Sequence, residues 1–316
     1  MELQTRALYN LIYFNLLQDK PMQCEHWQQE DYRSLSDDQL FKGVDSLGFT
    51  SDKEQLLAFI RDADSPEALT EFFVEEKGDP ATYDPLYLFI FELWRRNFPQ
   101  KKTLSLFCDE LDHLIYLYDN NLLESDEPLQ DDLESLKIIL EESFDEGQNP
   151  KKAWRVINQY CAHNISSFLY DYISELIDSG HEKYALDLLE GFSPFMDREK
   201  WFQFLQIRCC AHEDEKEQYT SLINDLIKHP DMELQIEVLD YLIEMPYHDL
   251  FFTLFSKTLS QVKNQESLLE LIDVASDYYT EDQEKLAHLR DLEKEIEEKD
   301  SDEISEFVKT FTSILR

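Results

Sequence analysis

The stretch G-H-E-K-Y-A-L-D-L-L, residues 180–189, has the pattern of a joint between two helices. An apolar helix ends at Gly180, a short polar turn follows, and a second helix is expected to begin with Ala185. Such a hairpin is either a solitary feature or one unit of a repeating array that presents a surface. A repeated hairpin favours a binding protein over an enzyme.

The composition indicates an all-α fold. Of 316 residues, 42% are hydrophobic, which is ample for a core in one large or two ordinary domains. Only 6 glycines and 10 prolines are present, so the special backbone positions that barrels, sandwiches and phosphate-binding loops require are scarce. We therefore expect helices along most of the chain.

The net charge of −39 restricts the kind of partner. A nucleic-acid partner requires a cationic surface that matches its phosphates, so the charge argues against one. A basic or amphipathic protein segment suits an acidic surface. The alternative explanation is a solvated acidic surface that serves solubility alone.

The sequence predicts a soluble protein. The first ten residues, M-E-L-Q-T-R-A-L-Y-N, carry an acid where a secretion signal has a basic start and an apolar run. The longest apolar stretch, at residues 85–94, is too short to span a bilayer and is interrupted by Glu92. Five cysteines, an odd number, do not suit a disulfide framework. We expect a cytoplasmic protein without membrane insertion.

Apolar residues recur every three or four positions, which is the period of an amphipathic helix. Helix starts are indicated at Ser36, Ser51 and Thr280, because each is followed three residues later by Glu or Gln and so can form a capping box. Pro66 suits the first position of a helix. Residues 232–239 alternate as a half-buried strand does, yet their apolar positions also fit helical spacing, and helix is the prediction.

The first expected domain, residues 1–122, is irregular. Its predicted helices cover residues 2–18, 36–46, 51–62, 66–76, 84–97 and 102–119. A strongly acidic stretch follows, and its start, D-N-N-L-L-E-S-D-E-P at residues 119–128, is the candidate domain boundary. The rest of that stretch keeps an apolar stripe, which predicts a helix.

The second expected domain, residues 125–316, is more regular. Pairs of helices begin near Ser166, Glu199, Asp231 and Gln265, and the spacing between these starts is nearly constant. This spacing is close to the length of a two-helix repeat, which buries its apolar face only by stacking on its neighbours. The hairpin therefore recurs, and an α-solenoid is predicted. The segment 301–316 is expected to be a capping helix.

Four residues in this domain carry a family resemblance. Gly180 lies at a turn, Ala185 follows as a small residue, Trp201 comes early in the next unit, and Pro230 closes it. With these residues, the stretch from 166 to about 231 resembles two tetratricopeptide repeats. The resemblance implies a tetratricopeptide-like array of helical hairpins that binds another protein.

Three Cys-x-His steps, at residues 24–26, 161–163 and 210–212, raise the question of a structural metal. Zinc takes thiolate and imidazole ligands, and two such pairs would supply four. However, the side chains of residues two apart on a helix point about 200° apart, so a Cys-x-His pair on a helix does not coordinate one ion. Buried thiols and exposed histidines are the simpler interpretation, and no metal or cofactor is expected.

Two other patterns contain metal-ligand residue types. Glu110 and His113 form one Glu-x-x-His step, which di-iron bundles use twice, and the sequence has no second copy. His248-Asp249 is the dipeptide of all-α metal-dependent phosphohydrolases, which makes a hydrolase using these two residues the alternative function. Further ligands would come from His212 or His229 and from Asp273 or Asp277. The dipeptide also suits a helix start, where the dipole favours an acid.

The main concentration of basic residues is L-W-R-R-N-F-P-Q-K-K at residues 93–102. Tryptophan and arginine are enriched at binding hot spots, although cations at a helix end also compensate acidic neighbours. The candidate partner contacts are Trp94, Arg95, Arg96, Lys101, Lys102, Tyr172 and Trp201. We expect an adaptor, scaffold or secretion-type chaperone, not an enzyme, that binds a basic or amphipathic protein segment on an acidic helical surface.

Overall fold

A computed structural model describes most of the chain. The described residues are 6–18, 24–49, 52–77, 79–145, 147, 149–196, 199–210, 221, 223–226, 228–298 and 304–315. Within these ranges all regular secondary structure is helical, which confirms the all-α prediction. None of the helices in these ranges is both long and apolar enough to cross a membrane.

The chain divides into two compact units. One comprises Met1–Tyr172 with Gly191–Asp197, and the other comprises Ile173–Glu190 with Arg198–Arg316. The boundary expected between residues 122 and 125 lies inside the first unit. The second unit begins within a helix, so the composition shift in the acidic stretch is not where these two units divide.

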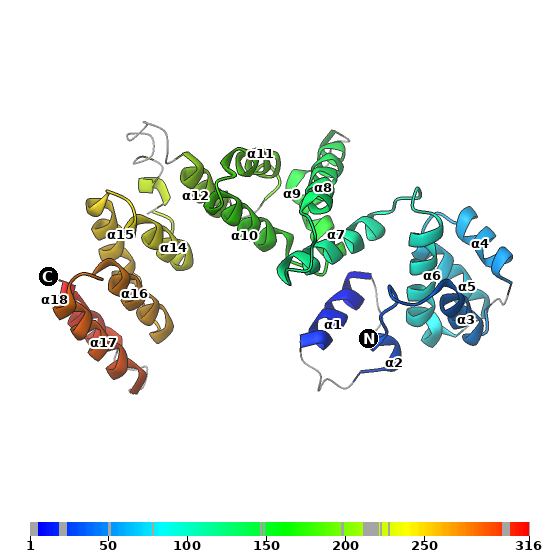
Figure 1. Ribbon diagram of the computed structural model, residues 1–316, viewed down its shortest axis with the longest axis horizontal. Coiled ribbons are helices and arrows are strands. Elements are labelled where there is room, and N and C mark those ends of the chain that lie inside the picture. Colours follow the sequence, from blue (N-terminus) through cyan, green and yellow to red (C-terminus); the bar gives the residue numbers. More distant parts are fainter. Residues whose placement is uncertain are drawn as a thin grey trace. The chain divides into compact units, whose positions relative to one another are not determined.

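The first unit contains the helices up to the start of α10 (Figure 1). They are α1 (Arg6–Gln18), α2 (His26–Gln29), α3 (Asp37–Ser46), α4 (Lys53–Asp62), α5 (Pro66–Lys77), η1 (Pro80–Thr82), α6 (Tyr83–Asn97), α7 (Leu104–Asp119), α8 (Glu127–Asp145), α9 (Pro150–Tyr160) and α10 (Ile165–Asp178). These bounds confirm the predicted helices to within a few residues, and they confirm a helix in the acidic stretch. Residues 2–5 of the first predicted helix lie outside the described ranges.

The second unit continues with seven helices in the described ranges. They are α11 (Glu182–Phe192), α12 (Glu199–Cys210), α14 (Met232–Ile243), α15 (His248–Gln261), α16 (Gln265–Tyr278), α17 (Gln283–Glu298) and α18 (Ile304–Leu315). The segment with an alternating pattern is thus a helix, α14, as predicted. Its start is capped by Asp231, whose side chain accepts a hydrogen bond from the backbone N–H of Leu234.

Helix α6 lies at the centre of the core in the first unit. It packs against α3, α4 and α5, and its Phe91 and Trp94 side chains are fully buried. Gly43 on α3 permits this approach, because a Cβ atom there would lie only 2.3 Å from the ring of Phe89 on α6. The backbone of α3 can therefore lie directly against the Phe89 ring, because Gly43 has no side chain.

Capping explains where several helices begin. The box at Ser36 is confirmed: its hydroxyl accepts from the Gln39 backbone, and the Gln39 side chain accepts from the Ser36 N–H. The helix after Ser51 is capped instead by Asp52, which accepts from Glu54 and Gln55. The prediction at Thr280 was wrong, since α17 begins with Gln283 and the carboxylate of Asp282 accepts from the Lys285 N–H.

The hairpin joint at residues 180–189 has the geometry that its sequence indicates. Gly180 has a φ of 79°, the left-handed conformation that glycine adopts without strain. The N–H of His181 bonds to the Leu176 carbonyl at 2.8 Å, so the last turn of α10 is closed. Helix α11 begins at Glu182, ahead of the expected start at Ala185, whose side chain is fully buried.

From α10 onward, alternate helices begin at regular intervals. Helices α10, α12, α14 and α16 begin at Ile165, Glu199, Met232 and Gln265, so the intervals between successive starts are nearly equal. Helix α14 packs against α15 and α16, and α16 packs against α17 and α18. Phe307 on α18 is buried in the same apolar core as residues of α14 and α16. Figure 1 shows α14 to α18 as successive neighbours.

Candidate binding surfaces

Solvent-accessible carboxylates form two matched rows on α14 and α16, which pack against each other. The rows follow the helical spacing that places side chains on one face. On α14 they are Glu233, Glu237, Asp240 and the following Glu244, and on α16 they are Glu266, Glu270, Asp273 and Asp277. Each acid of the first row has a counterpart in the second at the interval that separates the starts of the two helices. We call these eight residues the acidic face.

The carboxylates of the acidic face disfavour one another's charge. Desolvation by the surrounding protein, reinforced by the carboxylates of Glu237, Asp277 and Asp273, raises the pKa of Asp240 to about 6. Desolvation, with Glu266 and other acids, likewise raises the pKa of Glu270. A carboxyl with a raised pKa is one whose ionised form the structure destabilises. The acidic face therefore holds negative charge that a bound cation would stabilise.

The predicted basic contacts are largely engaged within the first unit. Arg95 and Arg96 both bond to Glu92, whose side chain is fully buried on α6. Arg96 also donates to the backbone carbonyl of Arg33 at 2.9 Å. These arginines neutralise a buried acid, which is the compensating role that the sequence left as the alternative.

Two predicted aromatic contacts belong to the core. Trp94 is fully buried, donates its indole N–H to the Lys101 carbonyl at 3.2 Å, and has the Lys101 ammonium 5.0 Å from its ring centroid. Tyr172 is likewise buried, with its ring 5.2 Å from that of Tyr118. Neither ring has an exposed surface for a partner, so the structure corrects the expectation that they are contact residues.

Lys102 and Trp201 have more accessible positions. Lys102 lines a hollow of about 260 Å³ together with Arg95, Glu110 and Asp132. Trp201 on α12 is half-buried, and its indole N–H donates to the side chain of Asp231 at 2.9 Å. Since Asp231 caps α14, Trp201 connects one helical pair to the start of the next.

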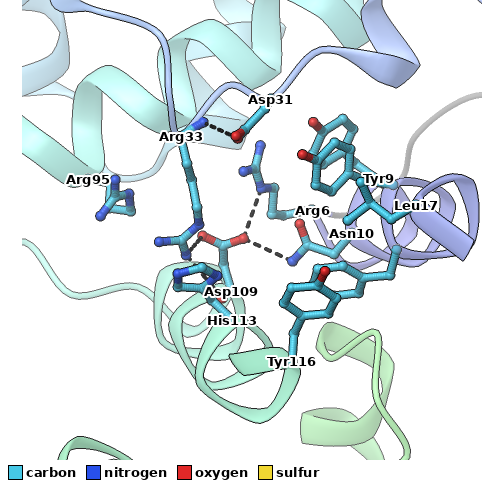
Figure 2. A pocket seen from close by; sticks show the side chains of 12 residues that line it. Arg6, Tyr9, Asn10, Leu17, Asp31, Arg33, Arg95, Asp109, His113 and Tyr116 are labelled. Carbon is cyan, nitrogen blue, oxygen red and sulfur yellow. Dashed lines mark hydrogen bonds and ion pairs between the residues drawn. The ribbon is translucent and has the colours of Figure 1, made fainter. Parts of the chain in front are cut away.

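A second candidate surface is a cleft of about 540 Å³ between α1 and α7, which sequence analysis did not predict. Figure 2 shows its side chains coming from α1, α6, α7 and the segment after α2. They are Arg6, Tyr9, Asn10, Tyr13, Phe14, Leu17, Asp31, Arg33, Arg95, Asp109, His113 and Tyr116. Three arginines thus meet at one hollow in a strongly acidic protein.

Asp109 organises the polar side of the cleft. Its Oδ1 accepts from Arg6 Nε and from Asn10 Nδ2, both at 2.9 Å, and its Oδ2 accepts from Arg33 Nη2 at 2.8 Å. Burial would raise the pKa of Asp109, but Arg6 and Arg33 outweigh burial and lower that pKa to about 2. Burial and the Arg33 charge also lower the pKa of His113. Asp109 is therefore a compensated anion.

Aromatic rings form the other side of the cleft. Phe14 stacks on Tyr116 with ring centroids 4.7 Å apart and an angle of 3° between the planes. Tyr9 stacks on Tyr13 at 5.8 Å. Leu17, one helical turn after Tyr13 on α1, is 44% exposed at the edge. The cleft thus combines flat apolar walls with guanidinium groups.

The described residues of the Cys-x-His steps have partners other than a metal. Cys161 is buried and lies within hydrogen-bonding reach of Cys108, while His163 bonds to Asp112 at 3.0 Å. Cys24 contacts Gln29 through its sulfur. The third pair lies outside the described side chains. Among the residues that the structure describes, no group of three or more His, Cys, Asp or Glu is arranged to hold a metal.

The residues of the alternative hydrolase function begin a helix. His248 and Asp249 are the first two residues of α15, and His248 Nδ1 lies 2.9 Å from the hydroxyl of Tyr278. His229 accepts a hydrogen bond from the Asp231 N–H at 3.4 Å, and Asp273 and Asp277 lie on the acidic face. His212 lies outside the described residues. Nothing in this arrangement favours the hydrolase hypothesis over the helix-start interpretation.

Comparison of the chain with protein-family models, with curated proteins and with solved structures found no match. The two surfaces therefore have to be interpreted from their own geometry.

Proposed function

We propose that this protein binds a basic or amphipathic segment of another protein on the acidic face, as an adaptor, scaffold or secretion-type chaperone. The observation that carries the proposal is the pair of matched rows of solvent-accessible carboxylates on the packed helices α14 and α16, and the raised pKa of Asp240 among them agrees with it. Lysine or arginine side chains placed over these rows would relieve the repulsion. Binding of this kind requires no cofactor.

The proposal includes a tetratricopeptide-like array of helical hairpins from α10 onward. It is supported by the regular starts of α10, α12, α14 and α16, and by the packing of α14 on α16 and of α16 on α18. The bond from Trp201 to the cap of α14 supports a repeated junction. In such an array, corresponding residues of successive units line one continuous surface. The acids at equivalent positions of α14 and α16 would then lie side by side on that surface.

The test uses a fluorescent amphipathic peptide with lysines spaced three and four residues apart along one helical face. We expect the peptide to bind, and its affinity to fall steeply between low and physiological salt, because screening weakens attraction between exposed charges. A peptide of the same length with glutamate in place of lysine is expected not to bind. Fluorescence anisotropy measures both.

A matched pair of variants separates the acidic face from the overall charge. The face variant carries Glu233→Gln, Asp240→Asn, Glu270→Gln and Asp273→Asn. The control carries Glu284→Gln, Asp291→Asn, Glu297→Gln and Glu298→Gln, at exposed positions on α17. We expect about a tenfold loss of affinity in the face variant and a much smaller loss in the control. Equal losses would show that only the net charge attracts the peptide.

Protonation provides a second readout of the same proposal. A cationic peptide on the acidic face should lower the pKa of Asp240, so binding near pH 6 should release protons. Calorimetry in two buffers with different ionisation enthalpies measures this release. A release that persists in Asp240→Asn would contradict the assignment to this residue.

A further inference from the structure

We infer that the cleft between α1 and α7 binds a small aromatic anion, with a carboxylate or phosphate group directed to the arginines and a flat ring against the aromatic wall. This inference concerns the first unit and does not depend on the proposed function of the acidic face. It rests on the hydrogen-bonding state of Arg6.

Arg6 is a buried guanidinium with unused donors. It is only 3% exposed, and the one hydrogen bond that it makes to the described residues runs from Nε to Asp109. In the described part of the chain, Nη1 and Nη2 of Arg6 donate to no acceptor, and Nη1 is buried. Buried N–H donors without partners cost free energy, so a native structure normally satisfies them with protein atoms, water or a ligand.

Two aromatic rings offset part of the positive charge of Arg6 without accepting hydrogen bonds from its Nη1 and Nη2 groups. Its guanidinium carbon lies 4.6 Å from the centroid of the Tyr9 ring and 4.9 Å from that of Phe91. Such cation–π contacts offset the positive charge but do not accept N–H hydrogen bonds in the plane of the group. The ion pair with Asp109 uses the Nε–H donor of Arg6 and does not explain the arrangement of its Nη groups.

The neighbouring arginines have spare donors as well. Arg33 directs only Nη2 to Asp109 and Glu110, which leaves its Nη1 without a hydrogen bond among the described residues. Arg95 uses Nε and Nη2 for Glu92, and its Nη1 has only a 3.9 Å contact with Glu110. The planar fork of arginine matches carboxylate and phosphate oxygens. An anion in the cleft would therefore meet donors from more than one residue.

The carboxylate of Asp109 does not satisfy the unused donors of the three arginines. Both oxygens of Asp109 accept short bonds from Arg6, Asn10 and Arg33, so its charge is compensated within the wall (Figure 2). The volume of about 540 Å³ falls within the range of small-molecule sites, and a site of this kind combines apolar walls with a few polar groups. The stacked Phe14 and Tyr116 rings provide a flat surface for an aromatic ligand.

Benzoate and phenyl phosphate are the probes, with acetate, inorganic phosphate and benzyl alcohol as controls. We expect saturable binding of an aromatic anion, at least about tenfold tighter than binding of acetate, inorganic phosphate or benzyl alcohol. Calorimetry on the full chain measures each affinity. Preference for benzoate assigns a carboxylate ligand, and preference for phenyl phosphate assigns a phosphate ligand. Equal responses to the aromatic anions and to benzyl alcohol would overturn the inference.

Substitution of Arg6 risks unfolding, so the decisive variants are at an exposed position. Leu17 and Leu11 are both 44% exposed on α1, but only Leu17 lines the cleft. We expect Leu17→Glu to weaken binding of the aromatic anion several-fold and Leu17→Lys to strengthen it, because a rim charge acts on the bound anion. Leu11→Glu and Leu11→Lys should have smaller effects. If the two positions behave alike, or no aromatic anion binds at millimolar concentration, the cleft is a structural ion-pair network only.

Discussion

Arg6 Nε donates a hydrogen bond to Asp109 Oδ1 at 2.9 Å, although the two residues are 103 positions apart in the chain. The bond joins the first turn of α1 to the middle of α7, and both side chains are almost completely buried. Asn10 and Arg33 complete the shell around the same carboxylate. On the polar side of the cleft, α1 is therefore held to α7 through this one carboxylate.

The first prediction is that Asp109→Asn destabilises the first unit by about 3–5 kcal/mol, because it leaves the buried Arg6 without its ion-pair partner and Arg33 with Glu110 alone. Urea unfolding followed by circular dichroism measures the change. Asp145→Asn, at an exposed position of α8, is the control and should change stability by less than about 0.5 kcal/mol. Similar midpoints for the two variants would exclude a stabilising role for the Asp109 network.

The same residue predicts an acid dependence. The pKa of Asp109 is lowered to about 2, from an unfolded value of about 3.9, so its ionised form stabilises the folded state above the unfolded pKa. This contribution, roughly 2–3 kcal/mol, is lost as the pH falls from about 4 through 2. The stability difference between the parent and Asp109→Asn should shrink over that interval. A constant difference would contradict the lowered pKa.

The second prediction concerns Asp240 and has the opposite sign. Its pKa is raised to about 6 in the folded state, so ionisation destabilises the folded protein as the pH rises from the unfolded pKa of about 3.9 to 6. Asp240→Asn should therefore raise the melting temperature at pH 7 and have little effect at pH 4. Asp291→Asn on α17 is the matched control. A stabilisation that is equal at both pH values would show that repulsion is not its cause.

Local features of the fold were predictable from the sequence, because their physical causes lie within a few residues. Ser36 and Gln39 form their capping box with each other, and Gly180 ends α10 through its own backbone conformation. The errors are also local. Thr280 has the residues of a capping box, but Asp282 competes for the same role and its carboxylate accepts from the first turn of α17.

The cleft was not predictable because its residues come from distant segments. Arg6 and Asp109 each occur in an amphipathic helix, where a single charge usually marks the solvated side. In the sequence, the one local indication that Arg6 and Asp109 are buried is that each lies next to apolar residues of the buried stripe. The acidic face had a stronger signal, since the acids at 233 and 240 recur at the equivalent positions 266 and 273 of the next helical pair. The net charge predicted an acidic surface, but it did not predict that the acids occupy equivalent positions of α14 and α16.

The third prediction tests the hairpin at residues 180–189. Ala185 is fully buried, so Ala185→Leu should overpack its surroundings and cost about 1–3 kcal/mol. Asp187→Leu adds a leucine at an exposed position of the same helix and should have a much smaller effect. Thermal melting of the two variants measures the difference. If Ala185→Leu melts with the parent, helices do not approach closely at this residue.

The last prediction concerns the C-terminal helix α18, whose buried residues are Phe307 and Phe311. Phe311 meets Phe255 on α15 edge to face, with ring centroids 5.6 Å apart, and α18 packs against α16 and α17. Ile304, Val308 and Leu315 are only partly buried, while Glu306, Lys309 and Thr310 face solvent. We interpret α18 as a cap that covers the apolar end of the helical series.

Phe311→Ala should accordingly cost about 3–5 kcal/mol, whereas Ser313→Ala at an exposed position should be nearly neutral. Deletion of residues 301–316 should lower the melting temperature and, because it uncovers Phe255 and its neighbours, cause concentration-dependent association that light scattering detects. The basic peptide should still bind to the truncated protein at low concentration, since the acidic face lies on α14 and α16. A truncated protein that stays monomeric and equally stable but no longer binds the peptide would make α18 the binding element and not the cap.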